Sequence, residues 1–342
     1  MKTNSRTGRE KRLIFVLISL SLLYLVLLQV QRHVERKMGI AGNPLSSNQL
    51  HQIQRRQALP FDLSQANIPL NEIHSGGPPK DGIPAISNPA TVAREQADFL
   101  SKDERVIGVD IEGRARAYPI SILNQHEIVN DRLGDTPIAV TYCPLCDSAV
   151  VFDRRTPLGE REFGVSGLLY NSNVLMYDRA ETESLWSQIK SEGVSGPATA
   201  QKLTVLPMEL TSWEAWQARH PHTDVLSSQT GYNRNYKANP YAGYFRQPNL
   251  MFPAKPQSNA MPLKERVLGI WGETNALAIP VSVFGHQSTQ LEKEINGKKI
   301  VIAFDASDQT VRIVSADEGL QWVNSFWFAW YAFRPQTEVV TR

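Results

Sequence analysis

Cysteine is almost absent from this chain. Only two of its 342 residues are cysteines, and both lie in the tetrapeptide Cys143-Pro144-Leu145-Cys146. A zinc site made of four thiolates is excluded, because it needs a second CxxC pair. Two thiols three positions apart can close a small disulfide, bind a soft metal or exchange electrons. The chemistry that can be inferred from this sequence therefore centres on these two residues.

The chain also lacks a strong excess of charge. Its formal net charge is +2, with 20% charged and 42% hydrophobic residues, whereas proteins that bind nucleic acids usually carry a marked basic excess. No hydrolase site is evident either, because residues 164–167 (Gly-Val-Ser-Gly) are one residue short of the G-x-S-x-G nucleophile elbow. The composition is that of an ordinary globular protein, with room for one large domain or two ordinary ones.

A single long hydrophobic run is present, at the N-terminus. Residues 13–28 carry no charge and Val30 extends the run, which gives about 27 Å of helix, enough to cross a bilayer core. Residues 1–12 form a basic tail, and the charge bias favours a cytoplasmic N-terminus. No small-x-small cleavage site follows closely. We predict an uncleaved single-pass anchor over residues 13–30 in the inner (cytoplasmic) membrane, rather than a removed signal peptide.

The body that follows the anchor is then expected in the periplasm, or otherwise outside the cytoplasm, where thiols meet an oxidising environment. Residues 31–80 are rich in Gln, Asn, Ser and Pro and show no regular hydrophobic period. We predict that they form a flexible tether. The folded domain is predicted over residues 81–342.

The body contains an internal repeat. Three segments return in the same order, the first two after 161 residues and the third after 162. The pairs are 104–109 with 265–270, 116–123 with 277–284, and 137–142 with 299–304. Three matches at a nearly constant offset indicate duplication. We place repeat one at about 100–195, a connecting region at about 196–260 and repeat two at about 261–335.

The expected fold is mainly β to α+β, with antiparallel sheets in two related repeat units. Strands at 106–111 and 114–119 flank Glu112-Gly113, which is typical of a hairpin turn. Further strands are expected at 136–142, 148–154, 161–166 and 174–178. Helices are expected at 213–220, capped by Thr211 or Ser212, and at 90–100.

The thiol pair lies where one predicted strand ends and the next begins. Pro144 favours a tight and rigid turn, which brings both sulfurs within reach of each other or of one ion. In the second repeat Asp305 and Asp308 occupy the aligned positions, so the shared scaffold does not require cysteine there. Four interpretations stay open: a disulfide that braces the turn, a redox-active dithiol, a metal site, and free thiols that are chemically inert.

A metal at Cys143 and Cys146 would need ligands of another kind as well. The candidates are His126, Asp147 and the histidines of the segment 220–222, and thiolates with imidazole suit copper(I) or zinc. His126 and the adjacent Glu127 are also candidates for acid–base chemistry. A capped turn that satisfies loop backbone is the structural alternative for both.

The polar stretch between residues 166 and 173 is a second candidate region. Its members, together with one tyrosine further on, are predicted to line a cleft and contact a cofactor: Ser166, Asn171, Asn173 and Tyr177. Turn formation is the alternative for Ser166 and Asn173. Several aromatic residues either form a binding wall or, by default, pack in the core: Trp213, Trp216, Tyr241 and Tyr244.

With these segments laid out, the chain resembles the bacterial family of uncharacterised DUF3179-domain proteins over roughly residues 76–337. The resemblance rests on motifs at residues 81–84, 116–119, 126–131, 141–146, 163–167, 176–179, 183–186 and 326–330. Because the family has no established activity, the resemblance implies no reaction. It implies one coherent site made of His126, the two cysteines and the 166–173 loop, with Asp147 as a departure from the expected uncharged residue.

Two hypotheses for function follow. The first is a membrane-anchored extracytoplasmic protein whose CxxC site handles thiol redox equivalents or a soft metal, copper or zinc, with a cell-envelope protein or metal donor as partner. The second is a binding or scaffold domain without catalysis, stapled by one disulfide, that presents a cleft to a cell-envelope partner. No nucleic acid is expected as a partner.

Overall fold

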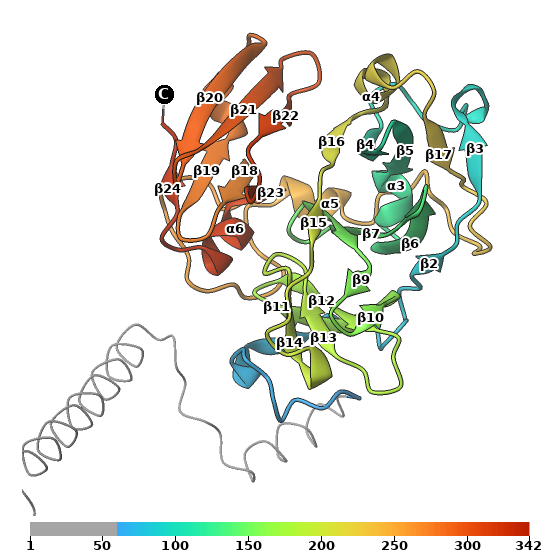
Figure 1. Cartoon of the computed structure of the whole chain (residues 1–342), viewed down its shortest axis with the longest axis vertical. Coiled ribbons are helices and arrows are strands. Elements are labelled where there is room, and N and C mark those ends of the chain that lie inside the picture. The colour runs from blue at the N-terminus through green and yellow to red at the C-terminus, as the bar shows by residue number, and fades with distance from the viewer. Residues whose placement is uncertain (1–59, 342) are drawn as a thin grey trace, which may run out of the picture. The chain divides into compact units, whose positions relative to one another are not determined.

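The computed structural model describes residues 60–341, which form a mainly β body (Figure 1). The predicted basic tail, anchor and most of the tether lie outside these residues. Within the described part, no helix has the length and apolar character needed to span a membrane. The folded body begins earlier than residue 81, because Phe61, Leu63 and Ile73 are buried and the strand at 73–75 pairs within a sheet.

The largest sheet has nine strands and runs through both halves of the sequence. In spatial order these strands are β2 (Ile86–Ser87), β6 (Ile128–Leu133), β7 (Thr136–Cys143), β8 (Ser148–Asp153), β23 (Gln321–Phe326), β18 (Arg266–Trp271), β19 (Ala276–Pro280) and β24 (Glu338–Val339), with β15 (Val205–Leu206) also paired to β8. The two halves meet where Asn324 of β23 faces Ala149 of β8. The thiol turn therefore lies at the junction of the halves, between β7 and β8.

Two five-stranded sheets belong to the first half of the body. One contains β1 (Ile73–Ser75), β11 (Phe163–Tyr170), β12 (Asn173–Asp178), β13 (Leu185–Ser187) and β14 (Glu192–Ser195). The other contains β16 (Glu209–Ser212), β4 (Arg105–Ile111), β5 (Arg114–Pro119), β17 (Asp224–Leu226) and β3 (Thr91–Ala93). Antiparallel pairing dominates, as predicted. The Glu112-Gly113 hairpin is confirmed, with φ of 53° and 77° at the two turn residues.

The remaining strands and the helices are short. The strands are β20 (Thr289–Ile295), β21 (Lys298–Asp305) and β22 (Thr310–Ala316) in one sheet, and β9 (Arg155–Thr156) with β10 (Gly159–Glu160). The helices are α3 (Ile120–Leu123), α4 (Trp213–Arg219), α5 (Ala242–Arg246) and α6 (Trp327–Phe333), with 3-10 turns η1 (Leu70–Glu72), η2 (Arg94–Gln96), η3 (Gly196–Ala198) and η4 (Val281–Phe284).

Two of the helix predictions have opposite outcomes. Helix α4 forms, and its cap is Ser212, whose side chain accepts a hydrogen bond from the Ala215 N–H. The helix predicted over residues 90–100 is wrong. Residues 91–93 instead pair with β17 as strand β3, because the β-branched Thr91 and Val92 suit an edge strand.

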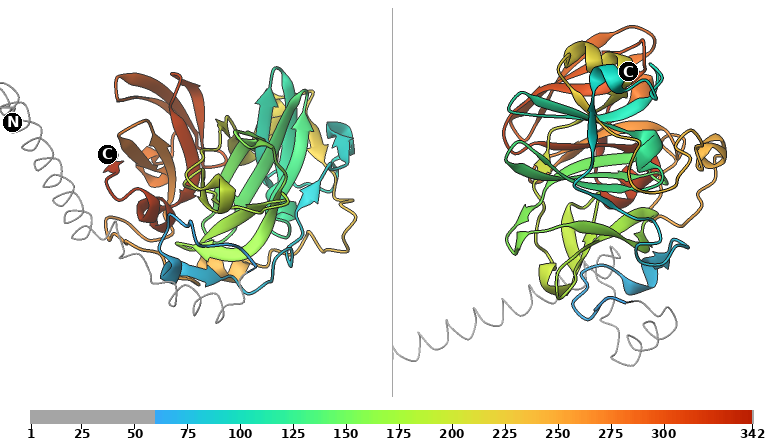
Figure 2. Two further views of the ribbon diagram at one scale, coloured as in Figure 1. Left: turned by 60° about the horizontal axis from the view of Figure 1, so that its bottom comes forward. Right: turned by 90° about the vertical axis from the view of Figure 1, so that its right-hand side faces the viewer.

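The orange-to-red strands of the second half lie beside the green strands of the first half (Figure 2, left). The same four-strand arrangement occurs once in each half. The first four-strand unit is β16-β4-β5-β17 with α4, and the second is β23-β18-β19-β24 with α6. In both, the last strand pairs in parallel and the other pairs are antiparallel. The first unit includes residues 209–226, which the sequence analysis assigned to the connecting region.

The two units also share their internal packing. A Cβ added at Gly108 would lie 2.2 Å from the Trp216 ring, and one added at Gly269 would lie 2.2 Å from the Trp330 ring. Each indole donates to a threonine, Trp216 to Thr223 at 2.9 Å and Trp330 to Thr337 at 3.0 Å. Each glycine thus permits the close approach of a buried tryptophan to the middle of its sheet.

Candidate functional site

The thiol turn joins two neighbouring antiparallel strands. Cys143 is the last residue of β7 and pairs with Ser148, the first residue of β8. The Cys146 N–H donates to the Cys143 carbonyl at 3.1 Å, which closes the turn. Both cysteines are free thiols and are almost fully buried, with exposures of 1% and 0%. The tight turn predicted from Pro144 is therefore present.

Both thiols point to one backbone carbonyl. The Cys146 Sγ lies 3.3 Å from the Ser172 oxygen and the Cys143 Sγ lies 3.8 Å from it. Burial raises the pKa of the Cys143 thiol, but hydrogen bonds from Cys146 and from the backbone N–H groups of Val174 and Leu145 outweigh burial and lower the pKa below its ordinary value. Burial and the neighbouring Cys143 raise the pKa of Cys146 well above its ordinary value. Cys143 is therefore the more acidic of the two thiols.

A network of buried side chains holds the loop that carries Ser172. Asn173 donates to Gln188 at 2.8 Å and to Ser148 at 3.2 Å, and Ser148 donates to Gln188 at 2.7 Å. Gln188 in turn donates to Thr141 on β7 at 2.9 Å. The network links the loop to both strands that flank the thiol turn, so the position of the carbonyl relative to the sulfurs is fixed.

Strained backbone surrounds the thiols. Glu127, Asp147, Asn171 and Ser172 have positive φ values of 58°, 45°, 52° and 61°. Residues other than glycine adopt this conformation rarely, and such residues cluster at functional sites. Asn171 also accepts a hydrogen bond from the Lys255 N–H, while its own Nδ2 is buried and has no partner among the described residues.

Glu127 is a buried acid that interacts electrostatically with Cys143, and the sequence indicated it only as an acid–base candidate beside His126. It is 8% exposed, and its carboxyl group makes no hydrogen bond within residues 60–341. Its carbonyl accepts from the Tyr142 N–H at 2.8 Å, which sets it beside the end of β7. Burial and the charge of Cys143 raise the pKa of Glu127 well above its ordinary value. The pairing of β6 with β7, which the sequence did not specify, brings it there.

Tyr241 and Tyr244 cover the thiols from the segment around α5. The Tyr244 hydroxyl donates to the Leu145 carbonyl within the turn at 2.9 Å. Burial raises the pKa of both tyrosines, and the nearby Cys143 adds to this effect. Trp213 and Trp216 instead pack in the core of the first four-strand unit. The predicted aromatic wall is thus divided between two places.

Both ring nitrogens of His126 are engaged by partners other than the thiols. Its Nδ1 lies 2.7 Å from the Pro84 carbonyl and its Nε2 lies 2.7 Å from the Tyr236 hydroxyl. Since a carbonyl only accepts, Nδ1 carries the proton and Nε2 accepts from Tyr236. Burial lowers the pKa of His126, which favours this neutral form. Neither cysteine is among its polar partners.

Asp147 is likewise engaged in ion pairs. Its carboxylate lies 2.8 Å from Arg105 and 2.8 Å from Arg266. Burial raises the pKa of Asp147, but the two guanidinium groups outweigh burial and lower it below its ordinary value. Within residues 60–341, no three His, Cys, Asp or Glu side chains gather into a group that could hold a metal ion. The predicted ligands His126 and Asp147 are thus not brought together with the two cysteines.

The four residues predicted to contact a cofactor separate into two pairs. Asn171 and Asn173 flank Ser172 and belong to the surroundings of the thiols. Ser166 instead donates to the Leu175 carbonyl and accepts from the Leu168 N–H, which stabilises an irregular part of β11. Tyr177 donates to Asp81, and Lys80 lies 4.4 Å from its ring. Ser166 and Tyr177 therefore have structural partners of their own.

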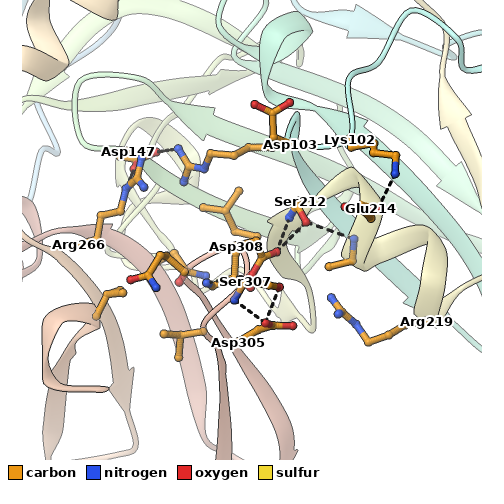
Figure 3. Close-up of a pocket in the computed structure, with 18 of the residues that line it drawn as sticks. Lys102, Asp103, Asp147, Ser212, Glu214, Arg219, Arg266, Asp305, Ser307 and Asp308 are labelled. Atoms are coloured by element: carbon orange, nitrogen blue, oxygen red, sulfur yellow. Dashed lines mark hydrogen bonds and ion pairs between the residues drawn. The ribbon is translucent and has the colours of Figure 1, made fainter. Parts of the chain in front are cut away.

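A groove of about 510 Å³ opens beside the thiol turn, between the two four-strand units (Figure 3). Asp147 with Arg105 and Arg266 lies at one end of it. Elsewhere in the groove the Asp308 carboxylate accepts from the Ser212 N–H at 3.1 Å and from its hydroxyl at 2.7 Å. We call this the junction groove. It is polar, and charged groups of both signs line it.

These features define a mainly β protein with a buried thiol pair at the junction of two similar units. A family model described as a protein of unknown function (DUF3179) matches residues 80–321, so the chain belongs to that family, as its motifs predicted. No curated protein and no solved structure matches the chain. The function of this protein is therefore inferred from the geometry of the site itself.

Proposed function

We propose that this is a membrane-anchored extracytoplasmic protein whose Cys143 and Cys146 cycle between a dithiol and a disulfide. The observation that carries the proposal is the geometry of the pair: two free thiols lie at the ends of one tight turn, and both sulfurs approach the same Ser172 carbonyl. The lowered pKa of Cys143 and the raised pKa of Cys146 agree with an attacking thiolate and a resolving thiol. On oxidation the two thiols give up two electrons and two protons to an acceptor disulfide, which becomes two thiols.

The size of the turn argues against a bracing role for the disulfide. A cross-link that closes a loop of only four residues stabilises a fold by about 2 kcal/mol on the chain-entropy estimate, less than longer loops provide. Soft-metal binding is the weaker form of the proposal, because His126 and Asp147 have other partners. Copper or zinc would have to be held by the two thiolates with ligands from outside this set.

Redox titration of the full-length protein tests the proposal. The protein is equilibrated in thiol–disulfide buffers and its free thiols are counted. We expect reversible oxidation at a potential above about −300 mV, the range of exchanging dithiols. In single variants, Cys146→Ser should leave a thiol that reacts with iodoacetamide at neutral pH, and Cys143→Ser should leave a slowly reacting one. A lower potential, or thiols that never oxidise in the folded protein, would reject the proposal.

The second candidate is a binding or scaffold domain that uses the junction groove. It is favoured by the polar groups from both four-strand units that line the groove. We also infer that these units arose by duplication, since their strand pairing and their glycine–tryptophan contacts correspond. Binding of a cell-envelope partner that persists in the Cys143→Ser, Cys146→Ser double variant would support this candidate over the redox one.

A further inference from the structure

A second cavity, of about 760 Å³, lies next to Arg105 and Arg266 and is separate from the buried thiols. The loop of residues 228–239 forms one side of it, and residues of β4 and α3 form another. Its size falls within the usual range for small-molecule sites, roughly 300–1,000 Å³. We call it the cationic cavity.

Basic side chains outnumber acidic ones in this cavity. Arg105, Arg234, Lys237 and Arg266 line it, against Asp103 and Glu104. Neither Arg234 nor Lys237 has an ion-pair partner in the described part of the chain. Arg105 and Arg266 share the single carboxylate of Asp147, and each uses one nitrogen for it. Since a guanidinium has five N–H donors, both arginines keep donors for another acceptor.

The cavity also holds a buried polar group without a partner. Asn124 is 5% exposed and lines the cavity. Its side-chain oxygen has no hydrogen-bond partner among residues 60–341. Buried amide oxygens are nearly always paired, so an unpaired one beside a cavity is a place for a hydrogen-bond donor of a ligand to bind.

Aromatic side chains supply the apolar part of the lining. Phe99, Phe245 and Tyr236 line the cavity. The Tyr236 hydroxyl is engaged by His126 and Thr230, so its ring is the part left to contact a ligand. A site with several cations, one amide and aromatic walls suits an organic anion better than a neutral or cationic molecule.

We propose that the cationic cavity binds a small organic polyanion through carboxylate or phosphate groups. Arg234 and Lys237 attract and hold it, and Arg105 and Arg266 contribute their remaining N–H donors. The unpaired side-chain oxygen of Asn124 accepts a hydrogen bond from a hydroxyl or N–H group of the ligand's body. The proposal does not depend on thiol chemistry, so it stands or fails separately from the redox function.

Isothermal titration of the full-length protein with citrate and with pyrophosphate tests this inference. We expect saturable binding of at least one probe, weakened by salt, with equal affinity for the oxidised and reduced protein. The Arg234→Gln, Lys237→Gln double variant should lose at least about tenfold in affinity. Both residues are exposed on a loop, so the variant is expected to fold.

A control variant removes the same charge elsewhere. Arg114→Gln with Lys299→Gln changes two exposed residues that do not line the cavity, and it should bind like the wild type. Binding of citrate alone identifies carboxylate as the ligand group, and binding of pyrophosphate alone identifies phosphate. No saturable binding of either probe, or equal losses in the test and control variants, would overturn the inference.

Discussion

Asp147 gives the sharpest prediction about stability. Its side chain is 1% exposed, and three groups donate to its carboxylate: Arg105, Arg266 and the Tyr142 hydroxyl, each at 2.8 Å. Asp147→Asn keeps the size of the side chain and removes its charge. The amide can still accept at its oxygen, but its nitrogen then faces one of the guanidinium groups. One arginine therefore loses its acceptor.

The expected loss is about 3 kcal/mol in the free energy of unfolding. Removing one partner of a buried ion pair typically costs about 3–5 kcal/mol. The lower end applies because the side chains of Arg105 and Arg266 are 27% and 48% exposed, so water can hydrate them when the carboxylate is gone. At roughly 2 °C per kcal/mol for a chain of this size, the melting temperature should fall by about 6 °C.

Urea unfolding followed by tryptophan fluorescence measures the effect, with Asp103→Asn as the control. Asp103 lines the same groove, and none of the described residues forms an ion pair with it. The folded state lowers the pKa of Asp147 below its ordinary value of 3.8. Its charge therefore stabilises the protein fully at neutral pH, and this contribution is lost as the pH falls below that value. The difference in the free energy of unfolding between the wild type and Asp147→Asn should therefore become smaller in acid. A loss under about 1 kcal/mol at pH 7, or a gap independent of pH, would refute the reasoning.

Two further predictions concern packing and a buried acid. Gly269→Ala should destabilise the protein by about 3 kcal/mol, because its Cβ would lie 2.2 Å from the Trp330 ring. The control Gly243→Ala, whose Cβ meets nothing within 4 Å, should change the free energy of unfolding far less. Equal effects of the two substitutions would contradict this packing. Glu127→Gln should stabilise the protein at pH 8 but not at pH 4, because the folded state raises the pKa of this carboxyl group and its ionisation opposes folding as the pH rises. Denaturation of this variant beside the exposed Glu112→Gln measures the effect, and a gain that does not depend on pH would count against a buried acid.

The strands were predicted well because strand and turn propensities depend on residues that are adjacent in the sequence. The hairpin at Glu112-Gly113 needs only a turn whose two central residues can adopt positive φ, and these two residues are adjacent in the sequence. The segment at residues 91–93 shows where such reasoning fails. It forms a strand because it pairs with β17, which lies more than a hundred residues further along the chain. A pairing over that distance produces no hydrophobic period that could be recognised in the local sequence.

The candidate site was predicted in part for the same reason. The Cys143–Cys146 turn is local, so its form could be inferred. The approach of Ser172 and Glu127 to the sulfurs depends on how β11, β12 and β6 are arranged, which sequence spacing does not encode. The polar partners of His126, the Pro84 carbonyl and the Tyr236 hydroxyl, come from segments 42 and 110 residues away, and sequence spacing does not indicate such partners.

The contacts at the junction of the two halves do not use the sulfurs. The turn of each half contacts the end of a strand in the other half. In the second half, the Asp308 carboxylate accepts from the Ser212 N–H. In the first half, Cys146 occupies the aligned position, but there the Cys146 backbone carbonyl accepts from the Phe326 N–H at 2.7 Å. One turn thus docks through its side chain and the other through its backbone. Because docking does not use the thiol, the Cys146 sulfur can point to Ser172 and lie beside Cys143 without weakening the contact between the halves.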